Sequence, residues 1–236
     1  MAFPTYQQLI GKTPVVDLST MLSGATQARG VKVLGKAEFL NPGFSMKDRI
    51  ARQIFDDAES SGELKPGGTV IAASSGNTGA AAAMVGAMRG YKVIIVTNAK
   101  CSQEKMDSIQ AYGAELIVVE DGVDYMDEAN RLAAENGWFD VNQYDNPANS
   151  KAHEETLAPE LLADTGGAIT HFVAGGSTGG TITGVGRGLK KVKPGVKIVL
   201  ADPFGSVFAP FFKTKELVKQ GTFLVEGYFK AATVAT

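Results

Sequence analysis

Lys47 stands at the junction between a turn and a helix, where its amine could do covalent chemistry. The preceding Asn41-Pro42-Gly43 cannot continue a helix or a central strand, so it predicts a loop. From Asp48 onward apolar residues recur at helical spacing, and Gly62 ends the run. The positive end of a helix and burial both disfavour an ammonium group, and a neutral lysine can form a Schiff base with an aldehyde. Taken alone, Lys47 is better explained as an exposed first-turn lysine.

The loop Ser74-Ser75-Gly76-Asn77-Thr78-Gly79 follows an apolar stretch and opens a helix of small residues. Its glycines allow backbone N–H groups to approach an anion, and a helix N-terminus favours negative charge. The side chains add donors, and the lack of Lys or Arg suits one carboxylate better than a triphosphate. Taken alone, the loop is better explained as an ordinary capped helix start.

A second loop, Gly175-Gly176-Ser177-Thr178-Gly179-Gly180-Thr181, suits a phosphate monoester held by backbone amides and hydroxyls. Thr181 stands where Gly-x-x-x-x-Gly-Lys-Ser/Thr has its lysine, and Gly-x-Gly-x-x-Gly is not present either. Asp202 nevertheless closes the next strand at about the spacing of a ribose-binding acid. A dinucleotide-binding unit is therefore a competing interpretation.

These three features together indicate one cofactor. A lysine that captures an aldehyde, a phosphate cradle and a carboxylate cradle suit a molecule with an aldehyde and a phosphate that acts on an amino acid. Pyridoxal 5'-phosphate is such a molecule, and its ring withdraws electrons from the substrate α-carbon.

The elements that must position these loops follow an alternating order of strands and helices. Solidly apolar strands are predicted at 31–37, 69–73, 93–97, 115–119, 172–174 and 197–202. After the helix of Lys47, helices are predicted at 80–89, 102–112, 124–136, 151–163 and 181–192. This is a doubly wound α/β architecture, in which strand-to-helix loops can converge on one cleft at the carboxyl ends of the strands.

Composition excludes several classes of protein. The chain has 236 residues, of which 44% are hydrophobic and 20% charged, and its net charge of -2 does not favour nucleic acid. Its one cysteine, Cys101, excludes an internal disulfide and a thiolate metal cluster. The N-terminal stretch is not a secretory signal, and the longest apolar run, 80–88, is too short to span a bilayer. We expect a cytoplasmic protein with no nucleic-acid or membrane partner.

The motifs, in this order, resemble those of the cysteine synthase and cystathionine β-synthase family. The stretch 41–49 resembles its Schiff-base motif, 74–79 its substrate-carboxylate loop and 177–181 its phosphate loop. Ile10-Gly11-Lys12-Thr13-Pro14 and Gln143-Tyr144-Asp145-Asn146-Pro147-Ala148-Asn149 also fit in order and spacing. The resemblance covers nearly the whole chain.

The resemblance implies a fold-type-II pyridoxal-phosphate enzyme with a fold like that of the tryptophan synthase β-subunit. Its two α/β subdomains would be a small one at 41–146 and a large one at 1–40 plus 147–236, the second incomplete. The implied reaction is β-replacement on serine or an O-activated serine, with a thiol or sulfide as the other substrate and L-cysteine or cystathionine as the product. The family also implies a homodimer.

The resemblance also carries residue roles by position. Lys47 would hold the cofactor and take the α-proton as general base, and Asn77 would hydrogen-bond the ring hydroxyl. The substrate would lie against Ser74, Ser75, Gly76, Thr78 and Gln143, and the phosphate against Ser177, Thr178, Gly179, Gly180 and Thr181.

Two departures lie in these motifs. Lys12 stands where the family has Asn, and Ser177 replaces a glycine, which adds a hydroxyl but tightens the turn. Among other reactive residues, Cys101 is best explained as a semi-buried thiol. His153 and His171 are far apart in sequence, and nothing around either indicates a metal site.

The largest departure is the end of the chain. After Val225-Glu226-Gly227 the family continues with Ile-Gly and a long segment that completes the large domain and supplies Ser or Thr to the pyridine nitrogen. Here Tyr228-Phe229-Lys230 follows, and the sequence stops at Thr236, so we expect that segment to be missing. The stretches 201–206 and 225–227 look nearer to the cystathionine-synthase branch.

Two further functions stay open at this point. One is deamination of serine or threonine on the same fold. The other is a non-catalytic relative that binds the cofactor, an amino acid or a partner enzyme, which the short C-terminal part of the sequence motivates.

Overall fold

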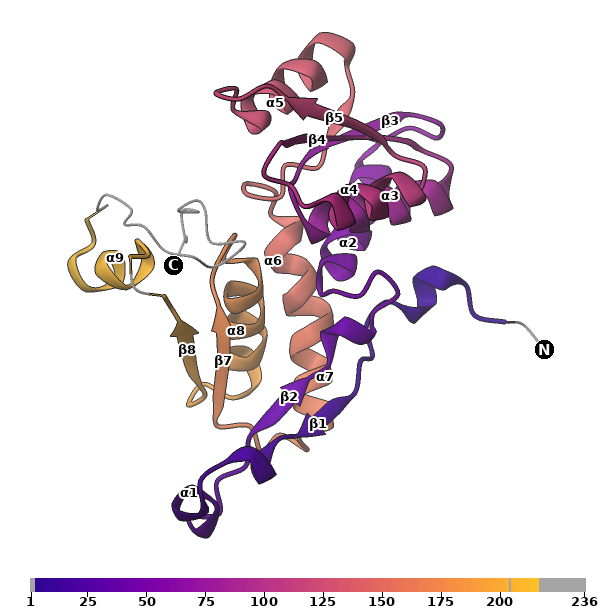
Figure 1. Cartoon of the computed structure of the whole chain (residues 1–236). Coiled ribbons are helices and arrows are strands. Elements are labelled where there is room, and N and C mark those ends of the chain that lie inside the picture. The colour runs from indigo at the N-terminus through magenta and orange to yellow at the C-terminus, as the bar shows by residue number, and fades with distance from the viewer. Residues whose placement is uncertain (1–2, 204, 217–236) are drawn as a thin grey trace.

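The computed structural model describes residues 3–203 and 205–216 (Figure 1). Phe204, within the stretch 201–206 compared above, and the whole stretch 225–230 lie outside the described residues. The first part of the chain forms η1 (Tyr6–Leu9), β1 (Val15–Asp17), η2 (Ser19–Met21), α1 (Gly24–Ala28), β2 (Leu34–Lys36), η3 (Glu38–Leu40) and α2 (Lys47–Ser61). The middle forms β3 (Thr69–Ala73), α3 (Asn77–Arg89), β4 (Lys92–Asn98), α4 (Gln103–Ala111), β5 (Glu115–Val119), α5 (Tyr125–Asn136) and β6 (Phe139–Asp140). The last described part forms α6 (Ala148–Ala152), the π-helical η4 (His153–Leu157), α7 (Ala158–Asp164), β7 (His171–Gly175), α8 (Gly180–Val192), β8 (Lys197–Ala201) and α9 (Phe208–Thr214).

Local sequence signals set several of these boundaries. Helix α2 begins at Lys47 and ends before Gly62, whose φ of 78° is left-handed. Helix α5 ends in the same way before Gly137, with φ 66°, and begins after Asp124, whose side chain accepts a hydrogen bond from the backbone of Met126. The predicted ends of both helices are thereby confirmed, and their starts, at Lys47 and Tyr125, differ by one residue from the predicted 48 and 124.

The central sheet has four parallel strands in the order β5-β4-β3-β6. Helices α2, α3 and α4 lie on one face and α5 on the other (Figure 1). Residues of β3 and β4 alternate between the two cores, with Val70, Ala72, Val93 and Ile95 on the first face and Ile71, Ile94 and Val96 on the second. This sheet is therefore doubly wound, as its continuous apolar strands predicted.

Strand β6 is an element that the sequence did not reveal. It has two residues and pairs with β3 on the side opposite β4, through Val70 with Phe139 and Ile71 with Asp140. Strand order therefore reverses at β3, which is where parallel α/β sheets place ligands. The loops after β3 and β6 meet at that point.

The second sheet differs from expectation. Strands β7 and β8 pair in parallel, and α8 packs on one of their faces. On the other face Val173 is 60% and Val199 40% exposed, so among the described residues this sheet is not covered on both sides. The predicted strand at 31–37 was also too long, because only β2 pairs, and it does so antiparallel to β1.

One long helical column separates the two sheets. Segments α6, η4 and α7 follow one another without a break, starting three residues before the predicted helix at 151–163. The column contacts α2 on the side of the central sheet and α8 on the side of the second sheet (Figure 1). The π-helical turn begins at His153, and such turns are frequent at functional sites.

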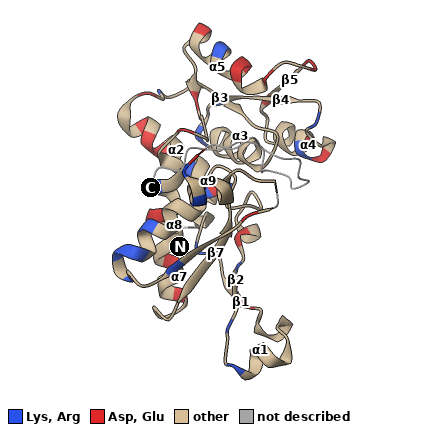
Figure 2. Ribbon diagram, turned by 90° about the vertical axis from the view of Figure 1, so that its left-hand side faces the viewer, with Lys and Arg blue, Asp and Glu red and all other residues tan. Residues whose placement is uncertain are grey.

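The charged side chains of both signs share the same helices, as Figure 2 shows for α5. There Arg131 pairs with Glu128 and with Glu135 at 2.6 Å each.

None of the helices in the described part of the chain combines the length and apolar content that a membrane span requires.

Glycines on one side of α8 allow the column to pack closely. A Cβ placed on Gly188 would lie 2.5 Å from Cβ of Ala158, and one on Gly184 would overlap the carbonyl oxygen of Ser150. A Cβ on Gly186, which faces β8, would meet Ile198 at an ordinary 3.5 Å.

We predict opposite effects for two alanine substitutions in α8. Gly188→Ala should lower the free energy of unfolding by about 1–3 kcal/mol, because overpacking outweighs the gain in helix propensity. Gly186→Ala should leave it unchanged or raise it by up to about 1 kcal/mol. Urea denaturation followed by circular dichroism measures both, and equal effects would show that α8 does not depend on close packing against the column.

Candidate active site

Twelve side chains and glycines that the sequence singled out line one cleft. The cleft has a volume of about 1870 Å³, above the range of roughly 300–1,000 Å³ usual for one small ligand. The residues are Lys47, Ser74, Ser75, Gly76, Asn77, Thr78, Gln143, Ser177, Thr178, Gly179, Gly180 and Thr181. The cleft therefore has room for more than one bound molecule.

Lys47 is the first residue of α2 and is half-buried in the wall of the cleft. No described residue forms a hydrogen bond or an ion pair with its Nζ. Burial lowers the pKa of this amine, because a charged ammonium is poorly solvated there. The lowered pKa moves Lys47 toward the neutral amine, which is the form that reacts with an aldehyde.

The loop that follows β3 is shaped by Ser74. Its buried hydroxyl oxygen accepts hydrogen bonds from the backbone N–H of Gly76 at 3.2 Å and of Gly79 at 2.9 Å. This support lets α3 begin at Asn77 rather than at the predicted residue 80. The first N–H groups of α3, which have no intrahelical acceptor, therefore belong to the predicted carboxylate loop. The Asn77 side chain is exposed to the cleft.

Gln143, in the loop that follows β6, contacts this loop. Its Nε2 donates to the carbonyl oxygen of Ala73 at 3.3 Å, so its Oε1 accepts the hydroxyl proton of Thr78 at 2.6 Å. The hydroxyl proton of Thr78 is thereby committed within the protein. Any hydrogen bond from Thr78 to a bound carboxylate would come from its backbone N–H.

The predicted phosphate loop connects β7 to α8. Gly179 has a φ of 79°, a left-handed conformation that favours glycine. Oγ1 of Thr178 accepts from the N–H of Gly180 at 3.3 Å, and Oγ1 of Thr181 lies 3.1 Å from Nε2 of His153 and 3.3 Å from Sδ of Met46. The loop is thus fastened to the start of α2 and to the helical column.

Lys12 and Ser177, the two departures from the family pattern, differ in backbone conformation. Lys12 has a φ of 51°, in the left-handed region that Asn tolerates better than Lys, and its backbone N–H donates to Glu160 at 2.9 Å. Ser177 does not have a positive φ, so a side chain is accommodated there without that strain.

His153 is a site residue that the sequence did not reveal. It is fully buried, and its Nδ1 has no partner among the described residues. Burial, followed by the nearby positive charges of Lys47 and Arg49, lowers its pKa to about 3, so the imidazole is neutral at pH 7. No local pattern could have indicated this role, because only the fold brings His153 to Thr181.

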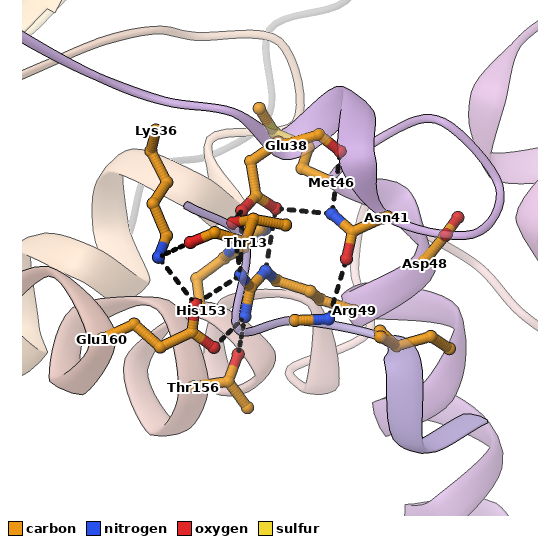
Figure 3. Close-up of polar contacts among 12 residues, drawn as sticks. Thr13, Lys36, Glu38, Asn41, Met46, Asp48, Arg49, His153, Thr156 and Glu160 are labelled. Carbon is orange, nitrogen blue, oxygen red and sulfur yellow. Dashed lines mark hydrogen bonds and ion pairs between the residues drawn. The ribbon is translucent and has the colours of Figure 1, made fainter. Parts of the chain in front are cut away.

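A buried ion-pair cluster holds the start of α2 (Figure 3). The fully buried guanidinium of Arg49 forms two hydrogen bonds with Glu38 at 2.8 Å each and two with Glu160 at 2.7 and 2.8 Å. Lys36 pairs with Glu160 at 2.9 Å and with Asp164 at 2.7 Å. Burial would raise the pKa of Glu160, but its bonds to Arg49, the Lys12 N–H and Lys36 prevail and lower it to about 2.

The turn before Lys47 has its own support. Asp48 Oδ2 accepts from the N–H of Gly43 at 2.5 Å, and burial raises the pKa of this carboxyl to about 6. Asn41 is buried and bridges the N–H of Gly11 and the carboxylate of Glu38 at 2.8 and 3.0 Å. The turn is therefore fixed from both sides.

The competing interpretations lose support in the structure. Asp202 accepts a hydrogen bond from the N–H of Ala209 and does not line the cleft, which disfavours a ribose-binding role. Cys101 is buried, with its Sγ 3.5 Å from the carbonyl oxygen of Ser75. The described residues contain no group of three or more His, Cys, Asp or Glu side chains that could hold a metal ion.

Comparison with known proteins gives consistent matches. Residues 6–225 match the model of a family described as pyridoxal-phosphate dependent enzyme. The chain is 41% identical over 228 residues to cysteine synthase 1 of Neurospora crassa. This alignment covers 92% of this chain and 59% of that protein. It is 40% identical over 233 residues to cystathionine beta-synthase of Apis mellifera, covering 95% and 45%.

A solved structure agrees with these matches. The crystal structure of O-ureido-L-serine synthase superimposes with a TM-score of 0.86 and 37% identity, over 98% of this chain and 71% of the other. The chain spans 59% of the length of the Neurospora crassa protein and 45% of the length of the Apis mellifera protein.

We predict that His153 makes stability depend on pH. The unfolded chain binds a proton at His153 below pH of about 6.5, whereas the folded chain does so only near 3, so stability is present above 6.5 and falls as pH falls. Between pH 7 and 5 the wild type should lose about 2 kcal/mol that His153→Gln does not lose. Asp48, with its raised pKa, has the opposite trend but is common to both proteins. Urea titrations at several pH values measure the difference, and parallel curves would contradict the prediction.

We also predict that Arg49 is far more important for stability than Arg131, an exposed arginine that likewise pairs with two carboxylates. Arg49→Met takes the guanidinium away from the buried carboxylates of Glu38 and Glu160 and should cost about 3–5 kcal/mol. Arg131→Met, which breaks two exposed pairs on α5, should cost less than about 1 kcal/mol. Chemical denaturation of both variants tests this, and similar losses would refute it.

Proposed function

The chain belongs to the family of pyridoxal-phosphate-dependent enzymes, and on this premise we propose that it binds pyridoxal 5'-phosphate and catalyses β-replacement. The amino-acid substrate is serine or an O-activated serine. A thiol or sulfide replaces its β-substituent, and the product is L-cysteine or cystathionine. The names of the relatives, cysteine synthase, cystathionine beta-synthase and O-ureido-L-serine synthase, support this class of reaction.

The observation that carries the proposal is the convergence of three loops around Lys47. The donor sets fit the cofactor and an amino acid. An unpaired half-buried amine suits an aldehyde, and the loop 177–181 at the start of α8 suits a phosphate. The loop 74–79 at the start of α3 suits a substrate carboxylate.

The residues of the cleft would divide the work of holding the cofactor, moving a proton and orienting the substrate. Bound pyridoxal phosphate supplies an electron sink that stabilises negative charge at the substrate α-carbon. Lys47 binds the cofactor and, with its lowered pKa, accepts and returns a proton at Nζ. Asn77 orients the ring, and the backbone of the loop 74–79 with Gln143 orients the carboxylate. The hydroxyls of Ser177, Thr178 and Thr181 hold the phosphate.

The neutral His153 has a supporting task. It contributes no charge near the amine, and through Nε2 it orients the hydroxyl of Thr181. A protonated imidazole would repel an ammonium at Lys47, so the low pKa of His153 keeps the two groups compatible.

We further propose two organisational features. The unit 41–146 and the remainder act as two subdomains, which the separate sheets on either side of the helical column support. The protein forms a homodimer, which the exposed side chains of Phe39 and Phe44, at 64% and 76%, support. A cytoplasmic location accords with one free cysteine. Light scattering of the purified protein measures the dimer.

We predict that Lys47→Ala abolishes covalent capture of pyridoxal phosphate and lowers turnover by roughly 10³-fold or more. Borohydride reduction followed by peptide mass spectrometry should label Lys47 in the wild type. Lys100→Ala, which removes an exposed amine at the same cleft, serves as the control and should retain capture. Labelling elsewhere in the wild type would refute the assignment.

Product analysis separates the possible reactions. Incubation with serine or O-acetyl-serine, with sulfide or a larger thiol, should yield cysteine or the corresponding thioether. A keto acid with ammonia as the only product would indicate deamination instead. Cofactor capture without any product would indicate a binding protein.

A further inference from the structure

We propose that Asn149, which is not among the residues assigned above to the cofactor or the substrate, is a positioning residue that couples the phosphate loop to the carboxylate loop. The inference rests on the proposed function and names a device within the same site. Asn149 is the second residue of α6 and is 4% exposed. Its Nδ2 donates to the carbonyl oxygen of Gln143 at 2.8 Å and to Oγ1 of Thr178 at 2.9 Å.

At the phosphate loop, Asn149 determines the direction of one hydroxyl. Oγ1 of Thr178 accepts from Nδ2 of Asn149 and from the N–H of Gly180, and these two bonds occupy both lone pairs. The hydroxyl hydrogen has no acceptor among the described residues, and Thr178 lines the cleft. Asn149 therefore makes Thr178 a donor toward a bound anion.

At the carboxylate loop, the same amide fixes the backbone of Gln143. The side chain of Gln143 spans from the carbonyl oxygen of Ala73 to the hydroxyl of Thr78. One continuous series of hydrogen bonds thus runs from Thr78 through Gln143 and Asn149 to Thr178. A shift of either loop is transmitted to the other through the amide.

The Asn149 amide has one buried polar atom without a hydrogen-bond partner among the described residues, which is energetically unfavourable. Oδ1 of Asn149 is buried and has no hydrogen-bond partner in the described part of the chain, a loss that proteins seldom accept. The amide also lies so close to Gly180 that a Cβ on that residue would come within 2.9 Å of Nδ2 and would overlap Oδ1. The two donated hydrogen bonds are what this arrangement preserves.

The test uses two substitutions at Asn149 that should both weaken cofactor binding, but by different amounts. Asn149→Ala removes the donor and should weaken pyridoxal phosphate binding about tenfold. Asn149→Asp keeps the shape but offers an acceptor, so the hydroxyl of Thr178 turns toward it and away from the phosphate. Its affinity should fall further, by about 100-fold. Equilibrium dialysis measures both values, and the ³¹P chemical shift of the bound cofactor should move in both variants.

Asn146→Ala is the matched control. Asn146 also makes two hydrogen bonds, to Val141 and Ala148, but it touches neither cradle, so its affinity should stay within about twofold of the wild type. Equal losses in the Asn146 and Asn149 variants, or an Asp variant that binds as well as the Ala variant, would overturn the inference.

A second measurement keeps the proposal falsifiable if the Asp variant does not fold. Thr178→Val removes the hydroxyl on which Asn149 acts. In that background Asn149→Ala should cause no further loss of cofactor affinity, while KM for the amino acid should still rise through Gln143. Additive losses of cofactor affinity would mean that Asn149 has only a structural role. A wild-type protein that binds no pyridoxal phosphate would refute the proposed function itself, which is a different outcome.

Discussion

The position of Lys47 depends on the buried ion pairs of Arg49, two residues further along α2. The guanidinium holds Glu38 from the N-terminal part of the chain and Glu160 from the helical column at the same time. A buried charge is strongly destabilising without its partners, so the loss of any one of these three side chains weakens the contact between all three segments. The start of α2 is thereby fixed relative to the column, and the column in turn carries His153 and Asn149.

Burial determines the chemistry of the site as much as its shape. The pKa of Lys47 is lowered by burial, and that of His153 is lowered by burial and by the charges of Lys47 and Arg49. Burial therefore disfavours the charged form of both bases, while hydrogen bonds to Arg49 lower the pKa values of Glu38 and Glu160 and keep both carboxylates charged. The negative charges of the Glu38 and Glu160 carboxylates thus remain paired with Arg49.

The three loops owe their convergence to the layout of the sheets. The loops after β3 and β6 meet because the strand order reverses at β3, and the loop after β7 reaches them because the helical column packs against both α2 and α8. Glycines on α8 allow that packing, and Gly180 continues the same side of the helix up to Asn149. Helix packing and ligand-binding loops are therefore parts of one arrangement.

The sequence by itself determined the features that arise from neighbouring residues. Turn residues placed Lys47 at a helix start, Gly62 and Gly137 ended helices, and apolar runs marked β3, β4 and β5. Only the tertiary structure decided β6, the exposed face of β7 and β8, and the roles of Arg49, His153 and Asn149. Each of these depends on contacts between segments far apart in the chain, such as Arg49 with Glu160 or Asn149 with Thr178, and no local pattern encodes such a contact.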